Sequence, residues 1–267
     1  MSLVFLHGFT GSPRSWQGFA ARFRARAAVR APALIGHGAG AGEPEQVVSF
    51  EDEVDRLAAR LRSERIRGAH LVGYSLGARV GLGLLLRHSE LFQRATLIGV
   101  HAGLDGADER RERIAADERW CELIEQRGLE AFVDTWQSQP LFATQLGLPG
   151  EVLAEQRRER LGHDPRGLIR ALRSVGLGRM PCYAARLGEI EVPVTLVVGE
   201  DDTKFREQSK AMLEVWPAAR LAVVPGCGHN VPLERPDALE QLLEIPSGGR
   251  LAPPTNQASG IRQGRHA

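Results

Sequence analysis

The sequence predicts an α/β fold in which a mostly parallel β-sheet is flanked by helices. Short apolar runs alternate with helical patterns over the first hundred residues, and the same alternation returns near residue 188. Strands that alternate with helices form parallel sheets through right-handed crossovers. With 267 residues, the chain has room for one large domain of this kind and an inserted subdomain.

The expected strands begin with Leu3–Leu6, which is apolar at every position, as in a strand buried on both faces of a sheet. Further strands are expected at Val29–Leu34, Ala69–Gly73, Ala95–Val100, Val194–Gly199 and Leu221–Val224. Two helix starts are marked by capping residues, Ser12 followed by Pro13 and Ser49 followed by Asp52. The expected helices are Arg14–Arg26, one that reaches about Ser63, one that reaches about His88, Phe205–Val215 and a short one from Pro236.

A different pattern fills the middle of the chain, where arginine-rich amphipathic helices replace the alternation from Leu104 to about Leu187. These helices are expected at Asp105–Glu125, Leu129–Gln137, Glu151–Arg160 and Arg166–Val175. Such a block is typical of a helical cap over the carboxyl edge of a sheet. We therefore expect a core of residues 1–103 and 188–245 and a cap of residues 104–187. In residues 246–267 no apolar period survives, so a disordered tail is predicted.

Composition and charge argue against several classes of protein. A formal net charge of +1 points to neither nucleic acid nor an anionic membrane as a partner, and no apolar run is long enough to span a bilayer. The three cysteines, Cys121, Cys182 and Cys227, lack metal-ligand or CxxC spacing, and an odd number fits free thiols in a reducing compartment. Because Leu3 already begins a core strand, we expect no leader peptide and a cytoplasmic location. The sequence does not set the oligomeric state.

A serine lies between the third strand and the helix that follows it, in Gly73-Tyr74-Ser75-Leu76-Gly77. In a strand–turn–helix context, Gly-x-Ser-x-Gly is typical of a nucleophile elbow, where the turn is too tight for a neighbouring Cβ atom and the hydroxyl is exposed. The pattern alone is weak in a chain with 30 glycines, where it could be a simple turn. The strand before it and the helix after it favour the elbow.

Two further residues follow later strands at the same edge of the sheet. Asp202 comes after the strand Val194–Gly199, and His229 comes after the next strand. The order Ser, Asp, His is that of the α/β-hydrolase fold, which we therefore predict, with Ser75, Asp202 and His229 as catalytic residues. Asp201 is an alternative for the acid, since Asp202 could simply cap a helix.

An oxyanion hole in this fold combines two backbone N–H groups. One should belong to Leu76, the residue after the serine, and the other to Phe9, in the glycine-bearing loop after the first strand. His37, between two glycines, could reach the site, or its backbone could simply hold a tight loop.

Arg79 lies four residues after Ser75, on the same face of a helix that is expected to be buried. A buried guanidinium requires an anionic partner, which could be a protein carboxylate or a substrate carboxylate held bidentately. A simple esterase has no need of a cation at this position.

Several stretches together resemble the 2-succinyl-6-hydroxy-2,4-cyclohexadiene-1-carboxylate synthase family, the pyruvate-eliminating lyases of menaquinone biosynthesis. The stretches are Leu3–Gly11, Gly73–Arg79, Trp136–Phe142, Gly199–Phe205 and Gly228–Asn230. The first two are common to the wider superfamily, whereas Trp-x-x-Gln-Pro-x-Phe and Asp-x-Lys-Phe-Arg are far more specific. The resemblance spans residues 3 to about 243 and includes the cap.

The resemblance implies a set of site residues by position. It favours Asp202 over Asp201 as the acid beside Ser75 and His229. The substrate-binding residues that it implies are Tyr74, Arg79, Arg113, Trp136, Arg160 and Lys204. Arg157 and Arg158 lie close to Arg160 and are alternatives for its position.

The implied activity is a lyase that needs neither a metal nor an organic cofactor and acts on a small-molecule polycarboxylate. Three substrate carboxylates would meet the cations, and Ser75, activated by His229, would act as a base rather than a nucleophile. One alternative is a serine carboxylesterase, thioesterase or C–C hydrolase in which Ser75 attacks carbon. Another is a ligand-binding relative without catalysis, against which the complete Ser75, Asp202 and His229 set argues.

Overall fold

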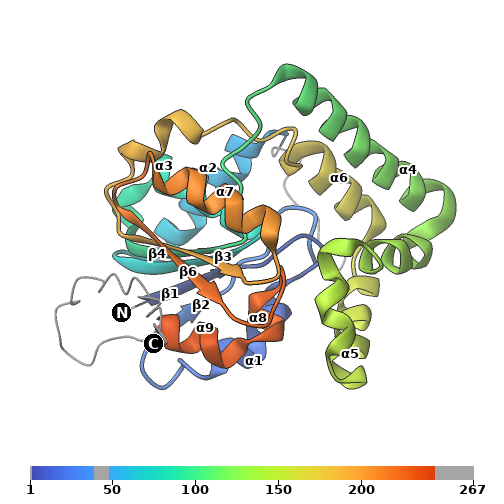
Figure 1. Cartoon of the computed structure of the whole chain (residues 1–267), viewed down its shortest axis with the longest axis horizontal. Helices are drawn as coiled ribbons and strands as arrows, with labels where there is room; N and C mark the ends of the chain where they lie inside the picture. The colour runs from blue at the N-terminus through green and yellow to red at the C-terminus, as the bar shows by residue number, and fades with distance from the viewer. Residues whose placement is uncertain (1, 39–47, 244–267) are drawn as a thin grey trace, which may run out of the picture.

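The computed structural model describes residues 2–38 and 48–243. The predicted tail, residues 246–267, lies outside the described residues. In the described part of the chain, one parallel sheet has the strand order β2-β1-β3-β4-β5-β6 (Figure 1). Its strands are β1 Ser2–Leu6, β2 Ala28–Arg30, β3 Ala69–Tyr74, β4 Phe92–Ile98, β5 Val194–Gly199 and β6 Ala219–Val224.

Helices cover both faces of this sheet. The α2, α3 and α7 helices lie on one face, and α1 and α9 lie on the other (Figure 1). Their bounds are α1 Gln17–Ala21, α2 Phe50–Ser63, α3 Leu76–Arg87, α7 Thr203–Leu213, α8 Val231–Glu234 and α9 Pro236–Leu243. Successive β1 residues enter different cores because side chains alternate along a strand: Val4 and Leu6 pack on one side, Leu3 and Phe5 on the other. The sheet is therefore buried on both faces, as the apolar runs predict.

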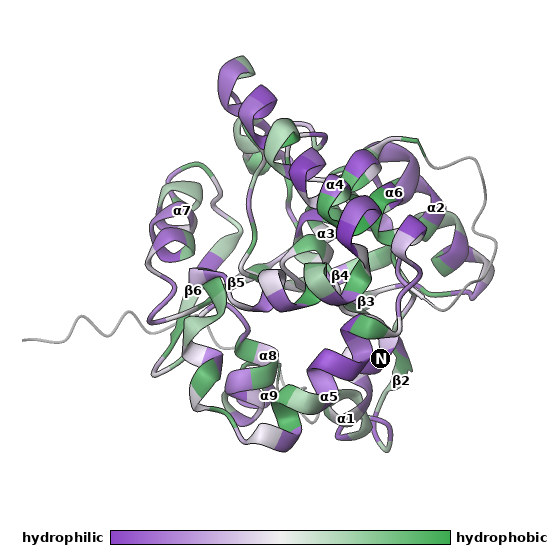
Figure 2. Cartoon of the chain, turned by 90° about the vertical axis from the view of Figure 1, so that its right-hand side faces the viewer, coloured by the Kyte–Doolittle hydropathy of each residue, from purple (hydrophilic) through white to green (hydrophobic). Residues whose placement is uncertain are grey.

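The helices of the segment expected to be a cap lie between β4 and β5 in the sequence and stand beside the sheet (Figure 1). They are α4 Ala107–Gln137, α5 Gly150–Leu161 and α6 Pro165–Val175, with a 3-10 segment at Pro140–Gly147. They share a core of their own that includes Cys121, Phe132 and Leu168. Figure 2 shows hydrophobic and hydrophilic residues interleaved along α6, as expected of a helix with one buried face. The α4 helix is interrupted at Gly128, whose φ is 79°, close to the predicted break between two helices.

Two expected elements are shorter than predicted. The first helix was expected to reach Arg26, but it is a 3-10 turn, Pro13–Trp16, followed by α1, which ends at Ala21. The second strand was expected to reach Leu34, but β2 ends at Arg30. Pro32 lacks the N–H group that a longer pairing with β1 would need.

The remaining expectations concern cysteines and membranes. Cys121, Cys182 and Cys227 are all free thiols, as their odd number indicated. Within residues 2–38 and 48–243, no helix combines the length and the apolarity needed to cross a bilayer.

Candidate active site

Ser75 lies at the end of β3, in the turn that leads into α3, with φ 51° and ψ −108°. Few residues other than glycine adopt a positive φ, so the surrounding turn holds this conformation against its strain. A Cβ atom on Gly73 would lie 2.5 Å from the carbonyl oxygen of Gly77, and one on Gly77 would lie 2.3 Å from that of Leu6. The two glycines are therefore required by close backbone contacts, as expected of a nucleophile elbow.

Ser75, His229 and Asp202 form a hydrogen-bonded chain. The Nε2 atom of His229 lies 3.0 Å from Oγ of Ser75, and its Nδ1 lies 2.7 Å from a carboxylate oxygen of Asp202. His229 is 2% exposed and Asp202 is 7% exposed, whereas Asp201 is exposed. With Nδ1–H donating to the carboxylate, Nε2 is free to accept the serine proton. The buried residue of the Asp201–Asp202 pair is the one that contacts the histidine.

A second carboxylate, which sequence reasoning missed, holds the loop that carries His229. Glu234 is buried and accepts hydrogen bonds from the backbone N–H groups of Gly228, at 2.8 Å, and Asn230, at 3.2 Å. These two residues flank the histidine, so Glu234 fixes the backbone on both sides of it. Its spacing of five residues after His229 was the only sequence signal.

Two backbone amides near Ser75 have no acceptor within the described part of the chain. They are the N–H groups of Phe9, after β1, and of Leu76, at the first position of α3. Both residues line the cavity above Ser75, and an ideal Cβ atom on Gly8 would lie 3.6 Å from that of Ser75. Unpaired amides at a helix start favour negative charge, so this arrangement suits an oxyanion.

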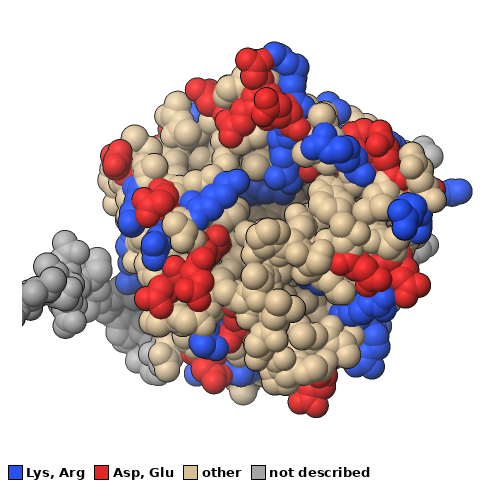
Figure 3. Space-filling model, turned by 45° about the vertical axis from the view of Figure 1, so that its right-hand side comes forward, with Lys and Arg blue, Asp and Glu red and all other residues tan. Residues whose placement is uncertain are grey.

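A cavity of about 870 Å³ lies over this site, with walls from both the core and the cap. Figure 3 shows a hollowed face with basic side chains along one edge of the hollow. The sequence-predicted residues that line the cavity are Phe9, Tyr74, Ser75, Leu76, Arg79, Arg113, Trp136, Arg160 and His229. In the described residues, no group of three His, Cys, Asp or Glu side chains could hold a metal ion.

Arg79 has no carboxylate partner within the described residues. Its Nη1 atom donates to the carbonyl oxygen of Val175 in α6, at 3.0 Å. Burial, and to a smaller extent the nearby Arg113, lower its pKa to about 9, while Asp117 acts in the opposite direction. Arg113, in contrast, pairs with the buried carboxylate of Asp117 at 2.9 Å. The three groups leave an excess of positive charge on this wall.

Arg160 is the arginine of its segment that faces the cavity. It is 5% exposed and makes no ion pair within the described residues, while burial lowers its pKa. Arg157 pairs with Glu130 and Asp134, and Arg158 pairs with Glu155. The two alternatives do not line the cavity, and each has a protein carboxylate as its partner.

Lys204 is located differently from the other implied cations. It is exposed in the first turn of α7 and is not among the residues that line the cavity. Its charge still acts on His101, whose pKa it helps to lower. The side chain is on the surface because α7 begins just beyond Asp202 and turns its buried face toward the sheet.

Aromatic residues also contribute to the wall of the cavity. The ring centroid of Trp136 lies 5.1 Å from that of Phe9 and 5.7 Å from that of Phe132. On the core side, the ring centroid of Tyr74 lies 5.4 Å from that of His229, and burial raises the pKa of its hydroxyl. These rings add apolar surface to the cavity, and the guanidinium of Arg160 lies over the ring of Phe142, 5.5 Å from its centroid.

His101, which sequence reasoning did not single out, also lines the cavity. Its Nδ1 accepts the backbone N–H of Gly103 at 3.0 Å, so the ring proton is on Nε2. Burial lowers its pKa to about 4, with Arg79 as the next cause, so the ring is neutral at physiological pH. The available sequence signal was its position just beyond the carboxyl end of β4, because Asp202 and His229 were found from the same position after their strands.

The parallel sheet, the elbow and the Ser75–His229–Asp202 chain together define an α/β hydrolase in the structural sense. Residues 3–242 match the alpha/beta hydrolase family. An esterase from Thermogutta terrifontis, crystallised with malate, has the same fold with a TM-score of 0.78 and 21% identity, over 91% of this chain and 88% of its own. At that identity the likeness concerns the fold alone.

More similar proteins narrow the family. A Bacillus subtilis (strain 168) protein, assigned provisionally as 2-succinyl-6-hydroxy-2,4-cyclohexadiene-1-carboxylate synthase, is 34% identical over 88% of this chain and 86% of its own. The synthase of that name from Salmonella schwarzengrund (strain CVM19633) is 32% identical over 91% and 94%. The structure of MenH from S. aureus has a TM-score of 0.87 and 30% identity, over 91% of both chains. The chain therefore belongs to the alpha/beta hydrolase family and, within it, to the 2-succinyl-6-hydroxy-2,4-cyclohexadiene-1-carboxylate synthase family.

Proposed function

We propose that this protein eliminates pyruvate from 5-enolpyruvoyl-6-hydroxy-2-succinyl-cyclohex-3-ene-1-carboxylate and so forms 2-succinyl-6-hydroxy-2,4-cyclohexadiene-1-carboxylate in menaquinone biosynthesis. One observation supports this above all others. The Ser75–His229–Asp202 chain opens into a cavity in which Arg79 and Arg160 have no carboxylate partner among residues 2–38 and 48–243. Buried cations without protein anions favour an anionic ligand, and the proposed substrate carries three carboxylates.

In the proposed reaction, His229 accepts the proton of Ser75, and Asp202 stabilises the resulting imidazolium. The serine oxygen then removes a proton from the ring carbon beside the succinyl carbonyl. The electron pair moves onto the carbonyl oxygen, which the N–H groups of Phe9 and Leu76 stabilise. When this pair returns, the ring C–O bond breaks, the diene forms, and the departing enolpyruvate takes up a proton to become pyruvate.

The binding roles follow the walls of the cavity. Arg79, Arg113 and Arg160 would hold the three carboxylates, and a low local dielectric strengthens each pairing. Tyr74 and Trp136 would enclose the ring, with the apolar wall setting its orientation. Lys204 would act only through its long-range charge at the entrance. The proposed cap of residues 104–187 supplies two of these arginines, and the proposed setting is the cytoplasm.

The test is pyruvate release from the enolpyruvyl precursor, generated in situ by the preceding enzyme and followed with a coupled lactate dehydrogenase assay. We expect release to depend on this protein and to fall by several orders of magnitude in Ser75→Ala. Release that is unaffected by this protein would contradict the proposal.

A nucleophilic role for Ser75 is the main alternative, since the same hydrogen-bonded chain serves esterases. Rapid-quench mass spectrometry of the native enzyme during turnover distinguishes the two. A lyase leaves Ser75 unmodified, whereas an acyl adduct on Ser75, together with rapid hydrolysis of p-nitrophenyl esters, would identify a hydrolase.

A further inference from the structure

Three buried histidines lie against the loop that follows β1. The ring centroids of His7 and His37 are 5.0 Å apart, and those of His37 and His163 are 5.5 Å apart. His7 lies at the start of the loop, His37 follows β2, and His163 belongs to the connection between α5 and α6 of the cap. Residues from three distant segments therefore meet at one short stretch of backbone.

Each ring holds a different peptide group of this loop. His7 Nδ1 donates to the carbonyl oxygen of Gly8 at 2.9 Å. The backbone N–H of Thr10 donates to His37 Nε2 at 3.3 Å, and His163 Nε2 donates to the carbonyl oxygen of Thr10 at 3.1 Å. Three consecutive peptide groups are thus each fixed by one imidazole.

The loop needs such support because its conformation is unfavourable. Gly11 donates to the carbonyl oxygen of Gly8 at 3.1 Å, which closes a turn with Phe9 and Thr10 at its centre. Thr10 has a φ of 62°, which is costly for a β-branched residue. Neighbouring groups must therefore hold the Thr10 peptide in place.

The same bonds set the direction of the Phe9 amide. The carbonyl oxygen of Gly8 and the N–H of Phe9 belong to one trans peptide and point in opposite directions. Since that carbonyl faces His7 and the N–H of Gly11, the N–H of Phe9 points away from them, without an acceptor in the described residues. The N–H of Gly11 shares a peptide group with the carbonyl oxygen of Thr10, so whatever holds that carbonyl also holds the donor that orients the Gly8–Phe9 peptide.

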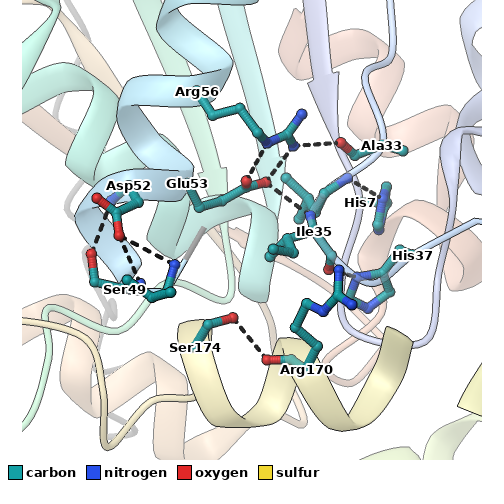
Figure 4. Close-up of polar contacts among 12 residues, drawn as sticks. His7, Ala33, Ile35, His37, Ser49, Asp52, Glu53, Arg56, Arg170 and Ser174 are labelled. Carbon is teal, nitrogen blue, oxygen red and sulfur yellow. Dashed lines mark hydrogen bonds and ion pairs between the residues drawn. The ribbon is translucent and has the colours of Figure 1, made fainter. Parts of the chain in front are cut away.

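On the core side, the His37 segment is itself well anchored (Figure 4). The backbone N–H of Ile35 donates to the buried Glu53 at 2.9 Å, and Arg56 donates to the carbonyl oxygen of Ala33 at 3.0 Å. His37 Nδ1 donates to the carbonyl oxygen of Ile35 at 2.7 Å, which leaves Nε2 as the acceptor for Thr10. Residues of the core therefore hold the backbone N–H of Thr10.

The carbonyl oxygen of Thr10 is held instead by His163, which belongs to the cap. His163 comes from the same segment as Glu159, whose carboxylate accepts the hydroxyl groups of Ser12 at 2.5 Å and Ser15 at 2.7 Å. Arg160 lies between these two contacts in the sequence. The cap segment that offers Arg160 to the cavity is therefore bonded to the loop that carries Phe9.

We propose that His163 is a positioning residue through which the seated cap holds the Phe9 amide in its oxyanion-binding orientation. The proposal rests on the proposed function, in which this amide stabilises the enolate oxygen. Burial lowers the pKa of His163, His37 and, to about 4, His7, so all three rings are neutral at physiological pH and keep one donor and one acceptor each. Arrival of a carboxylate at Arg160 would in this way stabilise the oxyanion hole as well.

The test compares His163→Leu, which removes the donor, with His163→Gln, whose amide can still donate at a similar reach. We expect His163→Leu to lower kcat for pyruvate release by about 10- to 100-fold, less than complete loss of an oxyanion donor costs. KM should change by less than about threefold, because no cavity cation is altered, and His163→Gln should recover most of kcat. The control is Arg157→Ala, which removes an exposed ion pair within the cap and should leave kcat unchanged.

A second measurement is independent of the lyase reaction. Phenylboronic acid adds to an activated serine and places an anionic oxygen where the oxyanion would be. Its affinity should fall in His163→Leu by a factor similar to the loss of kcat. Unchanged kcat or unchanged boronate affinity in His163→Leu, or no recovery with Gln, would overturn the inference. Absence of pyruvate release by the native enzyme would instead overturn the proposed function, while the boronate measurement would still decide the role of His163.

Discussion

Nη1 of Arg79 donates a hydrogen bond to the carbonyl oxygen of Val175, so a helix of the core and a helix of the cap meet at a cation and a neutral oxygen. The guanidinium retains further N–H donors for a ligand in the cavity, because it has no carboxylate partner in the described residues. We expect Arg79→Ala to lower kcat/KM for the precursor by about 100-fold, the loss typical of removing one member of a buried charge pair. Arg87→Ala is the matched control, since it lies on the same helix in an exposed pair with Asp55. Equal values of kcat/KM for the two variants would show that Arg79 has only a structural role.

Variants of Asp202 and Asp201 test which of the two carboxylates assists His229. Asp202→Asn should lower kcat on the order of 10⁴-fold, because an amide no longer stabilises the imidazolium or its tautomer. Asp201→Asn changes an exposed neighbour and should leave kcat within about twofold. Steady-state pyruvate release measures both, and a larger loss at Asp201 would reverse the assignment.

Arg160 and Arg158 lie two residues apart and face different surroundings. Arg160→Ala should raise KM by about 30-fold, since a substrate carboxylate would lose its partner in a buried site. Arg158→Ala removes an exposed pair with Glu155 and should not alter KM. The substrate dependence of initial rates separates the two, and a KM for Arg160→Ala equal to that of the native enzyme would contradict its binding role.

A variant of Gly77 tests whether close packing at the nucleophile elbow excludes a side chain at this position. Gly77→Ala should destabilise the fold by about 3 kcal/mol or more, because the new methyl would lie 2.3 Å from the carbonyl oxygen of Leu6. Gly18→Ala, in α1, has nothing within 4 Å of the new methyl and should be neutral or stabilise by about 0.5–1 kcal/mol. Urea unfolding compares them, and similar midpoints would show that the elbow tolerates a side chain.

Buried neutral histidines should make stability depend on pH. Burial lowers the pKa of His7 to about 4 and that of His70 to about 3, from an ordinary value of 6.5. Below pH 6.5 the unfolded chain binds more protons than the folded one, so the free energy of unfolding falls as pH decreases toward 4. Each histidine contributes about 1.4 kcal/mol per pH unit in this window. Urea midpoints at pH 7.5 and 5.5 measure the effect, His70→Gln should reduce it, and equal midpoints would contradict it.

The strands and the reactive residues were predictable because their signals are local. Strand β5 has the predicted bounds, Val194–Gly199, since a run of β-branched and apolar residues follows a proline and ends at a glycine. The expected order of Ser75, Asp202 and His229 along the chain also uses only local patterns, namely a strand and the residue just beyond it. The prediction for β2 was wrong, because Pro32 limits an edge strand whose composition otherwise suits a longer one.

The features that could not be predicted from the sequence depend on how distant segments of the chain pack together. Arg157, Arg158 and Arg160 have similar sequence surroundings, and only the docking of α5 on the core decides which of them enters the cavity. The contact between His163 and the Thr10 peptide joins residues 153 positions apart, so no local pattern indicates it. The exposed position of Lys204 likewise follows from the orientation of α7, which the motif around it does not encode.

The aromatic wall has one practical consequence. Three of the four tryptophans, Trp16, Trp120 and Trp136, line the cavity, whereas Trp216 is fully buried in the core and does not line it. Intrinsic fluorescence therefore arises largely from indoles beside the cavity, and ligand entry should change its intensity and emission maximum. The molecule carries a built-in optical probe with which ligand arrival can be followed by stopped flow, without a label and in variants that no longer turn over.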